Sequence, residues 1–277
     1  MGGKARPKKV LVRRHSGVTR VTHWVNVLAV SLLLMSGLQI FNAHPALYWG
    51  QTSTFAEPWM SMSMQERNDR PVGVTTLGGA RFETTGLFGY SGQVGKREPR
   101  GFPAWATVPS YRDLASGRRW HFFFAWLFVI NGLVYLGFAL AGGHLRRDLL
   151  PTRAQLRPRS IRRDVIDHLR LRFPKGEAAR TYNFLQKVAY LAMILAVLPL
   201  MLLTGLSMSP GFNAAAPWLI DLFGGRQSAR SVHFICAGLI VLFVLVHVAL
   251  VVLSGFWNNM RSMITGRYAI ETEEARP

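Results

Sequence analysis

Four histidines lie in or at the ends of long apolar segments of this 277-residue chain, at His23, His121, His233 and His247. An ionisable side chain inside such a segment is costly and usually functional, although each one alone could be an ordinary packing residue. On one helix, His233 and His247 would lie about 21 Å apart and face nearly the same side. By depth the four form two pairs, His121 with His233 and His23 with His247.

Two imidazoles that project at equal depth from different helices of a bundle suit a haem with two axial histidines. Zinc is a poorer match, because it needs three or four ligands and the apolar segments contain no Asp or Glu. A proton relay is the other alternative, but relays generally use carboxylates. We therefore expect two b-type haems, with all four histidines as iron ligands.

Arginines stand close to three of these histidines. Arg20 and Arg230 each precede a histidine by three residues, and Arg118 and Arg119 precede His121. One helical turn suits a guanidinium that pairs with a haem propionate. Arg20 could equally be a basic residue that sets the membrane orientation or extends its side chain to the membrane surface. These roles explain the other three arginines less well, because those fall on the predicted outer side. Four glycines within the segments could admit a flat macrocycle or serve helix packing: Gly37, Gly132, Gly205 and Gly238.

The composition indicates a membrane protein. Hydrophobic residues make up 49% and charged residues 17%, and 33 Lys+Arg against 14 Asp+Glu give a net charge of +19. Because the basic residues collect between the apolar segments, membrane topology is favoured over nucleic-acid binding. The single cysteine, Cys236, excludes an internal disulfide, a Cys-based zinc knuckle and a covalent-haem motif. The chain also has no phosphate loop and no flavin or nicotinamide fingerprint.

The four apolar segments cover residues 24–41, 120–141, 188–208 and 231–257. A bilayer core needs about 20 apolar residues in a helix, so each segment can span it. We expect an all-α integral membrane four-helix bundle that holds two b haems, with a long extracytoplasmic loop between helices 1 and 2. No small-x-small cleavage site follows Phe41, so we expect the first span to be retained rather than removed as a signal peptide. Tryptophans near the span ends are typical of membrane interfaces: Trp24, Trp49, Trp105, Trp120, Trp218 and Trp257.

Loop charges predict the orientation. Residues 1–20 carry seven basic side chains and no acidic one, and residues 145–180 carry eleven against four. The positive-inside rule then places both termini on the cytoplasmic side of a bacterial inner membrane. Around residues 161–171 either an interfacial helix or a solvated loop is compatible with the sequence.

The expected order is a basic cytoplasmic N-terminus (1–22), span 1 (23–41), an extracytoplasmic loop or cap (42–118), span 2 (119–142), a basic cytoplasmic loop (143–183), span 3 (184–208), an extracytoplasmic loop (209–229), span 4 (230–257) and a cytoplasmic tail (258–277).

The four histidines and the motifs around them resemble those of a known family, the bacterial cytochrome b561 and Ni-hydrogenase b-type cytochromes. The resemblance is closest in style to the membrane subunits of formate dehydrogenase and of thiosulfate reductase-like enzymes. It implies an outer haem on His121 and His233, an inner haem on His23 and His247, and quinone reacting near the inner one. It also implies a docked catalytic subunit with a molybdenum or iron–sulfur centre. The motifs that carry it are Arg14-His15, the run Thr19-Arg20-Val21-Thr22-His23-Trp24-Val25-Asn26, His121 at the head of span 2, and the His233/His247 pair.

The stretch from Gly101 to His121 resembles the branch found beside periplasmic sulfite-oxidase-like molybdoenzymes. We therefore expect a dihaem subunit, without catalytic residues of its own, that transfers electrons between an extracytoplasmic molybdoenzyme and the quinone pool. The alternative is a stand-alone oxidoreductase acting on superoxide or ferric iron, with Arg118, Arg119 and Arg230 steering the anion. Near the inner haem, quinone contacts and ordinary interfacial roles are both open for Arg20, Asn26, Asn183, Gln186 and His247.

Overall fold

The computed structural model describes residues 8–143, 145, 149–173 and 181–272. Parts of the predicted N-terminus, of the basic loop 143–183 and of the tail 258–277 lie outside these residues, among them Lys4, Arg6, Asp148 and Glu177. The chain divides into two compact units. Unit 1 comprises Met1–Trp24, Asn131–Leu198 and Leu239–Pro277, and unit 2 comprises Val25–Ile130 and Pro199–Gly238.

Four helices in the described part of the chain are long and apolar enough to cross a membrane, which confirms the prediction of four spans. Each contributes residues to both units. Two of them begin before their apolar segments because polar residues cap their first turns: the Ser16 hydroxyl accepts from the Thr19 N–H, and the Asp113 carboxylate accepts from the Ala115 N–H. The spans are α1 (Gly17–Phe41), α2 (Leu114–Ala141), the segment Phe184–Met208, and α8 (Arg226–Leu253).

The third span is composed of three consecutive helical stretches, α4 (Phe184–Ala192), the π-helical η4 (Met193–Val197) and α5 (Leu198–Met208). The Asn183 side chain accepts from the Gln186 N–H, and the Gln186 side chain accepts from the Asn183 N–H, which forms a capping box. The π-helical stretch ends two residues before Pro199, whose ring would clash with the carbonyl four residues earlier, that of Leu195, in a regular α-helix. The sequence thus explains where the irregular turn lies.

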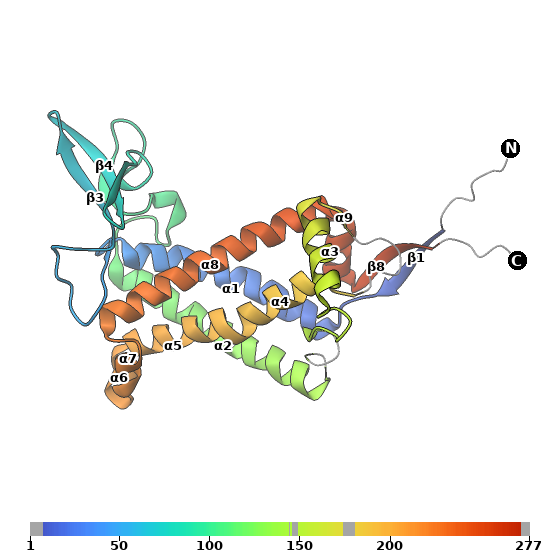
Figure 1. Cartoon of the computed structure of the whole chain (residues 1–277). Helices are drawn as coiled ribbons and strands as arrows, with labels where there is room; N and C mark the ends of the chain where they lie inside the picture. The colour runs from blue at the N-terminus through green and yellow to red at the C-terminus, as the bar shows by residue number, and fades with distance from the viewer. Residues whose placement is uncertain (1–7, 144, 146–148, 174–180, 273–277) are drawn as a thin grey trace, which may run out of the picture. The chain divides into compact units, whose positions relative to one another are not determined.

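Among its described residues, unit 1 holds two short helices and a terminal ribbon in addition to its parts of the spans (Figure 1). The helices are α3 (Pro158–Leu169) and α9 (Phe256–Thr265). Strands β1 (Lys8–Arg13) and β8 (Arg267–Thr272) pair antiparallel, with Val10 opposite Ile270. The Asn258 side chain exchanges two hydrogen bonds of 2.9 Å with the backbone of Ala269, so α9 fixes the ribbon.

In unit 2, the predicted outer loop forms a small β cap (Figure 1), so the protein is mostly helical and the expectation of an all-α fold was wrong for this loop. Its core contains the buried side chains of Phe41, Leu47, Met60 and Met62, against which Phe234 of α8 packs. Met60 and Met62 alternate with less buried residues, as expected for a strand with one buried face. One antiparallel sheet of the cap contains β2 (Ala46–Leu47), β3 (Met60–Arg67), β4 (Arg70–Leu77) and β5 (Ala80–Glu83). The cap also contains the hairpin of β6 (Gly89–Ser91) and β7 (Glu98–Arg100) and the 3-10 turn η1 (Ala104–Ala106). The segment 209–229, also in unit 2, forms the short helices α6 (Pro210–Ala215) and α7 (Trp218–Leu222).

The cap is joined to the first turns of α8 by hydrogen bonds. The Gly50 carbonyl accepts from the backbone N–H groups of Gln227 and Ser228, which a helix start leaves without intrahelical partners. The Ser231 hydroxyl donates to the Tyr48 carbonyl at 2.6 Å and accepts from the Trp59 indole at 2.9 Å. Because Ser231 lies two residues before His233, these bonds also fix the helical turn that carries this histidine.

Candidate functional site

In unit 2, His121 of α2 and His233 of α8 face each other. Their ring centroids lie 6.2 Å apart and the ring planes are inclined by 62°. The sequence predicted this pair from equal depth in two spans, and the structure places the two residues together. Both side chains are largely buried among the helices of unit 2.

Each of these imidazoles uses its Nδ1 atom for a hydrogen bond within the protein. The Nδ1 of His121 lies 3.2 Å from the Leu33 carbonyl and 3.1 Å from the Ser36 hydroxyl. The Nδ1 of His233 lies 3.0 Å from the Thr204 hydroxyl, which itself donates to the Leu200 carbonyl at 2.7 Å. A carbonyl can only accept, so Nδ1 carries the proton and Nε2 keeps its lone pair for a metal.

A glycine stands beside each ring of this pair. A Cβ atom on Gly37 would lie 3.4 Å from His121 Cε1, and one on Gly205 would lie 3.3 Å from His233 Cε1. Ser36-Gly37 in α1 and Thr204-Gly205 in α5 thus repeat one arrangement, in which the hydroxyl holds Nδ1 and the glycine leaves room for the ring. Sequence reasoning missed Ser36 and Thr204. The repeated hydroxyl–glycine dipeptide in two spans was the available signal.

Unit 1 holds the second predicted pair. The ring centroids of His23 in α1 and His247 in α8 lie 6.3 Å apart, with planes inclined by 68°. Phe243 stacks on His247 at 6.0 Å with an interplanar angle of 9°. The buried Asn131 amide of α2 donates to the Thr22 carbonyl at 2.8 Å, directly before His23. Three spans therefore position this pair.

Both pairs fit a haem with two axial imidazoles. An iron–nitrogen bond is about 2.0 Å and an imidazole centre lies about 1.1 Å beyond its nitrogen, so two axial rings would have centres about 6.2 Å apart. The observed separations are 6.2 and 6.3 Å. Among the described residues, no group of three or more His, Cys, Asp or Glu side chains could hold a metal ion. Two imidazoles at this separation suit an axial pair better than a zinc cage, which needs three or four ligands.

The predicted arginines make different contacts. Arg230 donates to the backbone carbonyls of His44 and Ala46, and its guanidinium lies over the Phe41 ring. Arg119 donates to the Ser116 hydroxyl, and Arg118 lies over Phe122. In unit 1, Arg20 donates to the Ile264 carbonyl at 3.0 Å. Each guanidinium has more donors than these bonds use, so the contacts leave donors for a propionate.

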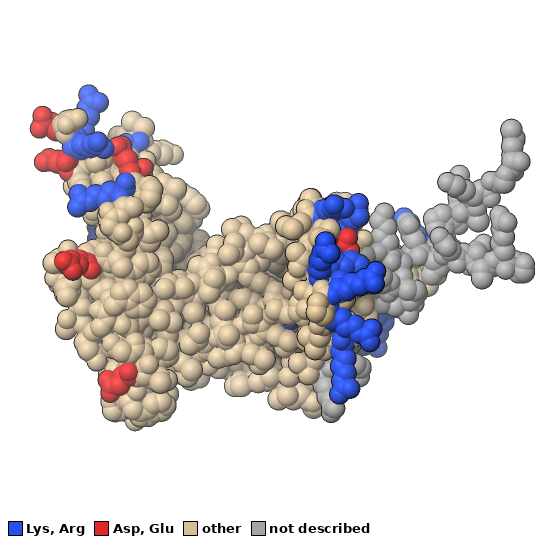
Figure 2. Space-filling view, in the orientation of Figure 1, with Lys and Arg blue, Asp and Glu red and all other residues tan. Residues whose placement is uncertain are grey.

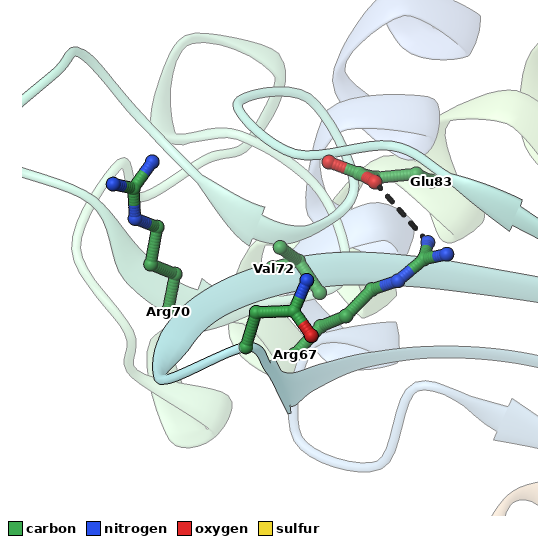
Figure 3. Close-up of a pocket in the computed structure, with 5 residues that line it drawn as sticks. Arg67, Arg70, Val72 and Glu83 are labelled. Atoms are coloured by element: carbon green, nitrogen blue, oxygen red, sulfur yellow. Dashed lines mark ion pairs between the residues drawn. The ribbon is translucent and has the colours of Figure 1, made fainter.

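Two of the residues considered for quinone have a structural role at the start of the third span. Asn183 and Gln186 cap α4, which accounts for both side chains structurally. Asn26 belongs to unit 2, whereas Arg20 and His247 belong to unit 1. A shallow surface hollow lies elsewhere, at the β3–β4 hairpin, and is lined by Arg67, Asn68, Arg70, Val72 and Glu83 (Figure 3). It contributes no ligand to either histidine pair.

Comparison with known proteins agrees with this arrangement. The family model described as prokaryotic cytochrome b561 matches residues 14–266. A putative protein-methionine-sulfoxide reductase subunit, YedZ1, of Azospira oryzae is 31% identical over 239 residues, which cover 86% of this chain and 90% of that relative. No solved structure matches the chain significantly. The chain therefore belongs to the prokaryotic cytochrome b561 family, membrane proteins of electron transport that bind b-type haem.

Proposed function

We propose that this chain is a dihaem membrane subunit that transfers electrons between the quinone pool and an extracytoplasmic molybdoenzyme. The observation that carries the proposal is the presence of two histidine pairs, each with the ring separation of an axial ligand pair. His121 and His233 would hold one haem, and His23 and His247 the other. When bound, a haem with two histidine ligands supplies reversible one-electron transfer at its iron.

The protein's own part is to keep both ligands of each pair in place during electron transfer. Thr204 and the Leu33 carbonyl hold the Nδ1 atoms of His233 and His121, so neither ring has to turn to present Nε2. Arg20, Arg118, Arg119 and Arg230 would supply donors to the propionates. Because Arg230 is fixed by two backbone carbonyls, its guanidinium is already oriented one turn before His233.

The relative's name suggests both the partner and the direction of transfer. YedZ1 is named as a subunit of a protein-methionine-sulfoxide reductase. A related partner here would reduce a sulfoxide to a thioether and release water, which consumes two electrons and two protons. Quinol oxidation supplies two electrons and releases two protons. The electrons would therefore run from quinol through the inner pair and the outer pair to the partner.

Two observations favour a partnered subunit over a stand-alone superoxide or ferric-iron oxidoreductase. The stand-alone function would use Arg118, Arg119 and Arg230 to steer an anion toward the outer pair, yet Arg230 is only partly exposed and bonds to the backbone carbonyls of His44 and Ala46. The cap itself exposes aromatic side chains, including Trp49 and Trp105, which offer contact area to a protein. Neither feature favours a small anion.

The proposal is tested with the purified chain and a short-chain quinol. Quinol should reduce the b-type absorbance bands anaerobically, and a co-purifying sulfoxide reductase should reoxidise them only when a sulfoxide is present. The His121→Ala variant should accept electrons from quinol but pass none to the partner. Rapid reduction by superoxide, without any response to quinol or to a soluble partner, would favour the stand-alone function instead.

A further inference from the structure

Helix α3 and the residues that flank it carry exposed arginines for which the described structure provides no acidic partner. The described segment 149–173 contains seven arginines and two aspartates. None of the seven guanidinium groups pairs with a carboxylate among the described residues. Figure 2 shows these basic side chains gathered over α3 on the face in view. The arginines, all exposed, are Arg153, Arg157, Arg159, Arg162, Arg163, Arg170 and Arg172.

The same helix also exposes an apolar strip. Leu169 is 80% exposed and Val165 is 36% exposed, and their spacing of four residues places both on one side of the helix. Arg162 precedes Val165 by three residues and thus borders the strip. The surface of this helix therefore combines exposed apolar side chains with unpaired arginines. It suits a boundary between apolar chains and negatively charged groups.

Hydrogen bonds hold α3 against the start of the third span. The Asp164 carboxylate accepts from the Phe184 N–H at 3.1 Å, and the Asn183 amide lies 3.4 Å from His168 Nε2. Just before the helix, the Gln155 side chain donates to the Tyr182 carbonyl at 3.0 Å. Because Phe184 is the first residue of a membrane-spanning segment, these bonds place α3 at a membrane surface.

We propose that α3 is an interfacial helix that binds the phosphate groups of anionic phospholipids. Val165 and Leu169 insert beside the acyl chains, while Arg159, Arg162 and Arg163 contact headgroup phosphates. Asp164 and Asp167 offset part of this charge, but seven arginines against two aspartates leave the segment 149–173 with a net charge of +5. The occupant is lipid rather than an acidic protein, since the apolar strip and the arginines share one short helix fixed to a spanning segment.

The charge contribution is tested with the full-length protein in phosphatidylcholine vesicles that contain either spin-labelled phosphatidylglycerol or spin-labelled phosphatidylcholine. The wild type should associate preferentially with phosphatidylglycerol. In the variant Arg159→Gln/Arg162→Gln/Arg163→Gln that preference should fall at least about tenfold, and added salt should weaken it in the wild type. The matched control, Arg67→Gln/Arg70→Gln/Arg81→Gln in the cap, removes three other exposed arginines and should keep the wild-type preference.

The depth of the helix is tested with a fluorophore on Leu169→Cys in a Cys236→Ala background. Lipids with brominated acyl chains should quench this probe strongly and should not quench the same probe on Leu87→Cys in the cap. Equal association with both spin-labelled lipids, an unchanged preference in the α3 triple variant, or an unquenched probe at position 169 would each overturn the proposal. So would binding of an acidic soluble protein that displaces no lipid. None of these measurements depends on haem content.

Discussion

His121 and His233 face each other at 6.2 Å between ring centroids, and each donates its Nδ1 proton to a different neighbouring span. Leu33 and Ser36 of α1 hydrogen-bond to the Nδ1 of His121, and Thr204 of α5 hydrogen-bonds to that of His233. All four spans of unit 2 therefore determine the orientation of this one pair. A rigid pair of this kind changes little between oxidation states of a bound metal, which suits electron transfer.

Removing one histidine should abolish one haem and leave the other. His121→Ala or His233→Ala should eliminate the outer haem, and His23→Ala or His247→Ala the inner one, because a single imidazole gives a weak axial ligand set. Pyridine haemochrome analysis per polypeptide measures the loss. His168→Ala serves as the control, since His168 bonds to Asp164 and Asn183 and should leave both haems bound.

The hydroxyl group of Thr204 should control the outer haem. Thr204→Val keeps the side-chain shape but removes the acceptor for His233 Nδ1, so haem affinity should fall roughly tenfold to a hundredfold. Ser36→Ala should have a smaller effect, because the Leu33 carbonyl remains 3.2 Å from His121 Nδ1. Haem transfer to apomyoglobin measures both variants. Equal losses in the two would contradict the assigned hydrogen bonds.

Gly205 should not tolerate a branched side chain. Even a Cβ atom there would lie 3.3 Å from His233 Cε1, so the methyl groups of Gly205→Val must displace the ring. The outer haem should be lost while the inner one stays bound. The control is Gly211→Val in the same unit, outside the spans, where a Cβ atom would meet no atom within 4 Å. If the two variants gave the same haem spectrum, the steric explanation for Gly205 would be refuted.

Arg100 should be the main polar contributor to the stability of the cap. It is 3% exposed and donates to Phe102, Glu98, Ser110 and Thr107. Arg100→Gln should destabilise the cap by about 2–4 kcal/mol, because several buried acceptors lose their donor. Limited proteolysis within residues 42–118 reports the change.

The exposed ion pair of the cap provides the control for that experiment. Arg67 and Glu83 lie 3.6 Å apart with both side chains more than half exposed (Figure 3). Arg67→Gln should therefore change stability by less than about 1 kcal/mol. If it opened the cap to protease as readily as Arg100→Gln does, burial would not be the cause.

The cap should lose stability in mild acid. Burial lowers the pKa of His44, and the positive charge of Arg230 lowers it further. The unfolded chain then binds more protons than the folded one, so stability falls as the pH decreases below the ordinary value of 6.5 and levels off below the lowered pKa. Melting curves from about pH 7.5 to about pH 5 measure this slope, and His44→Gln should flatten it. An unchanged slope in His44→Gln would assign the effect to other groups.

The spans and the histidine pairs could be predicted from the sequence because both follow from the regular geometry of the helix. Apolar length predicts a spanning helix, and equal depth predicts that His23 meets His247. The sequence predicted a loop or cap over residues 42–118 but not its strands. Its core depends on Met60 and Met62 packing against Phe41 and Phe234, which are distant in the chain and carry no local signal of contact.

The contacts of Arg230 also show where sequence reasoning ends. Its spacing from His233 suggested a propionate, but spacing cannot reveal that the chain after α1 turns back and presents two carbonyls to the guanidinium. Helix α3 is a third case. The sequence left an interfacial helix and a solvated loop open, and its bonds to Phe184 and Asn183 come from tertiary structure.

The central claim is most directly tested by measuring haem per polypeptide in the purified wild-type chain, together with its reduced-minus-oxidised spectrum. Two histidine pairs with separations of 6.2 and 6.3 Å predict two b-type haems per chain. One haem would show that one pair is not a ligand pair. No haem, in a folded sample from cells that supply it, would contradict the electron-transfer function itself.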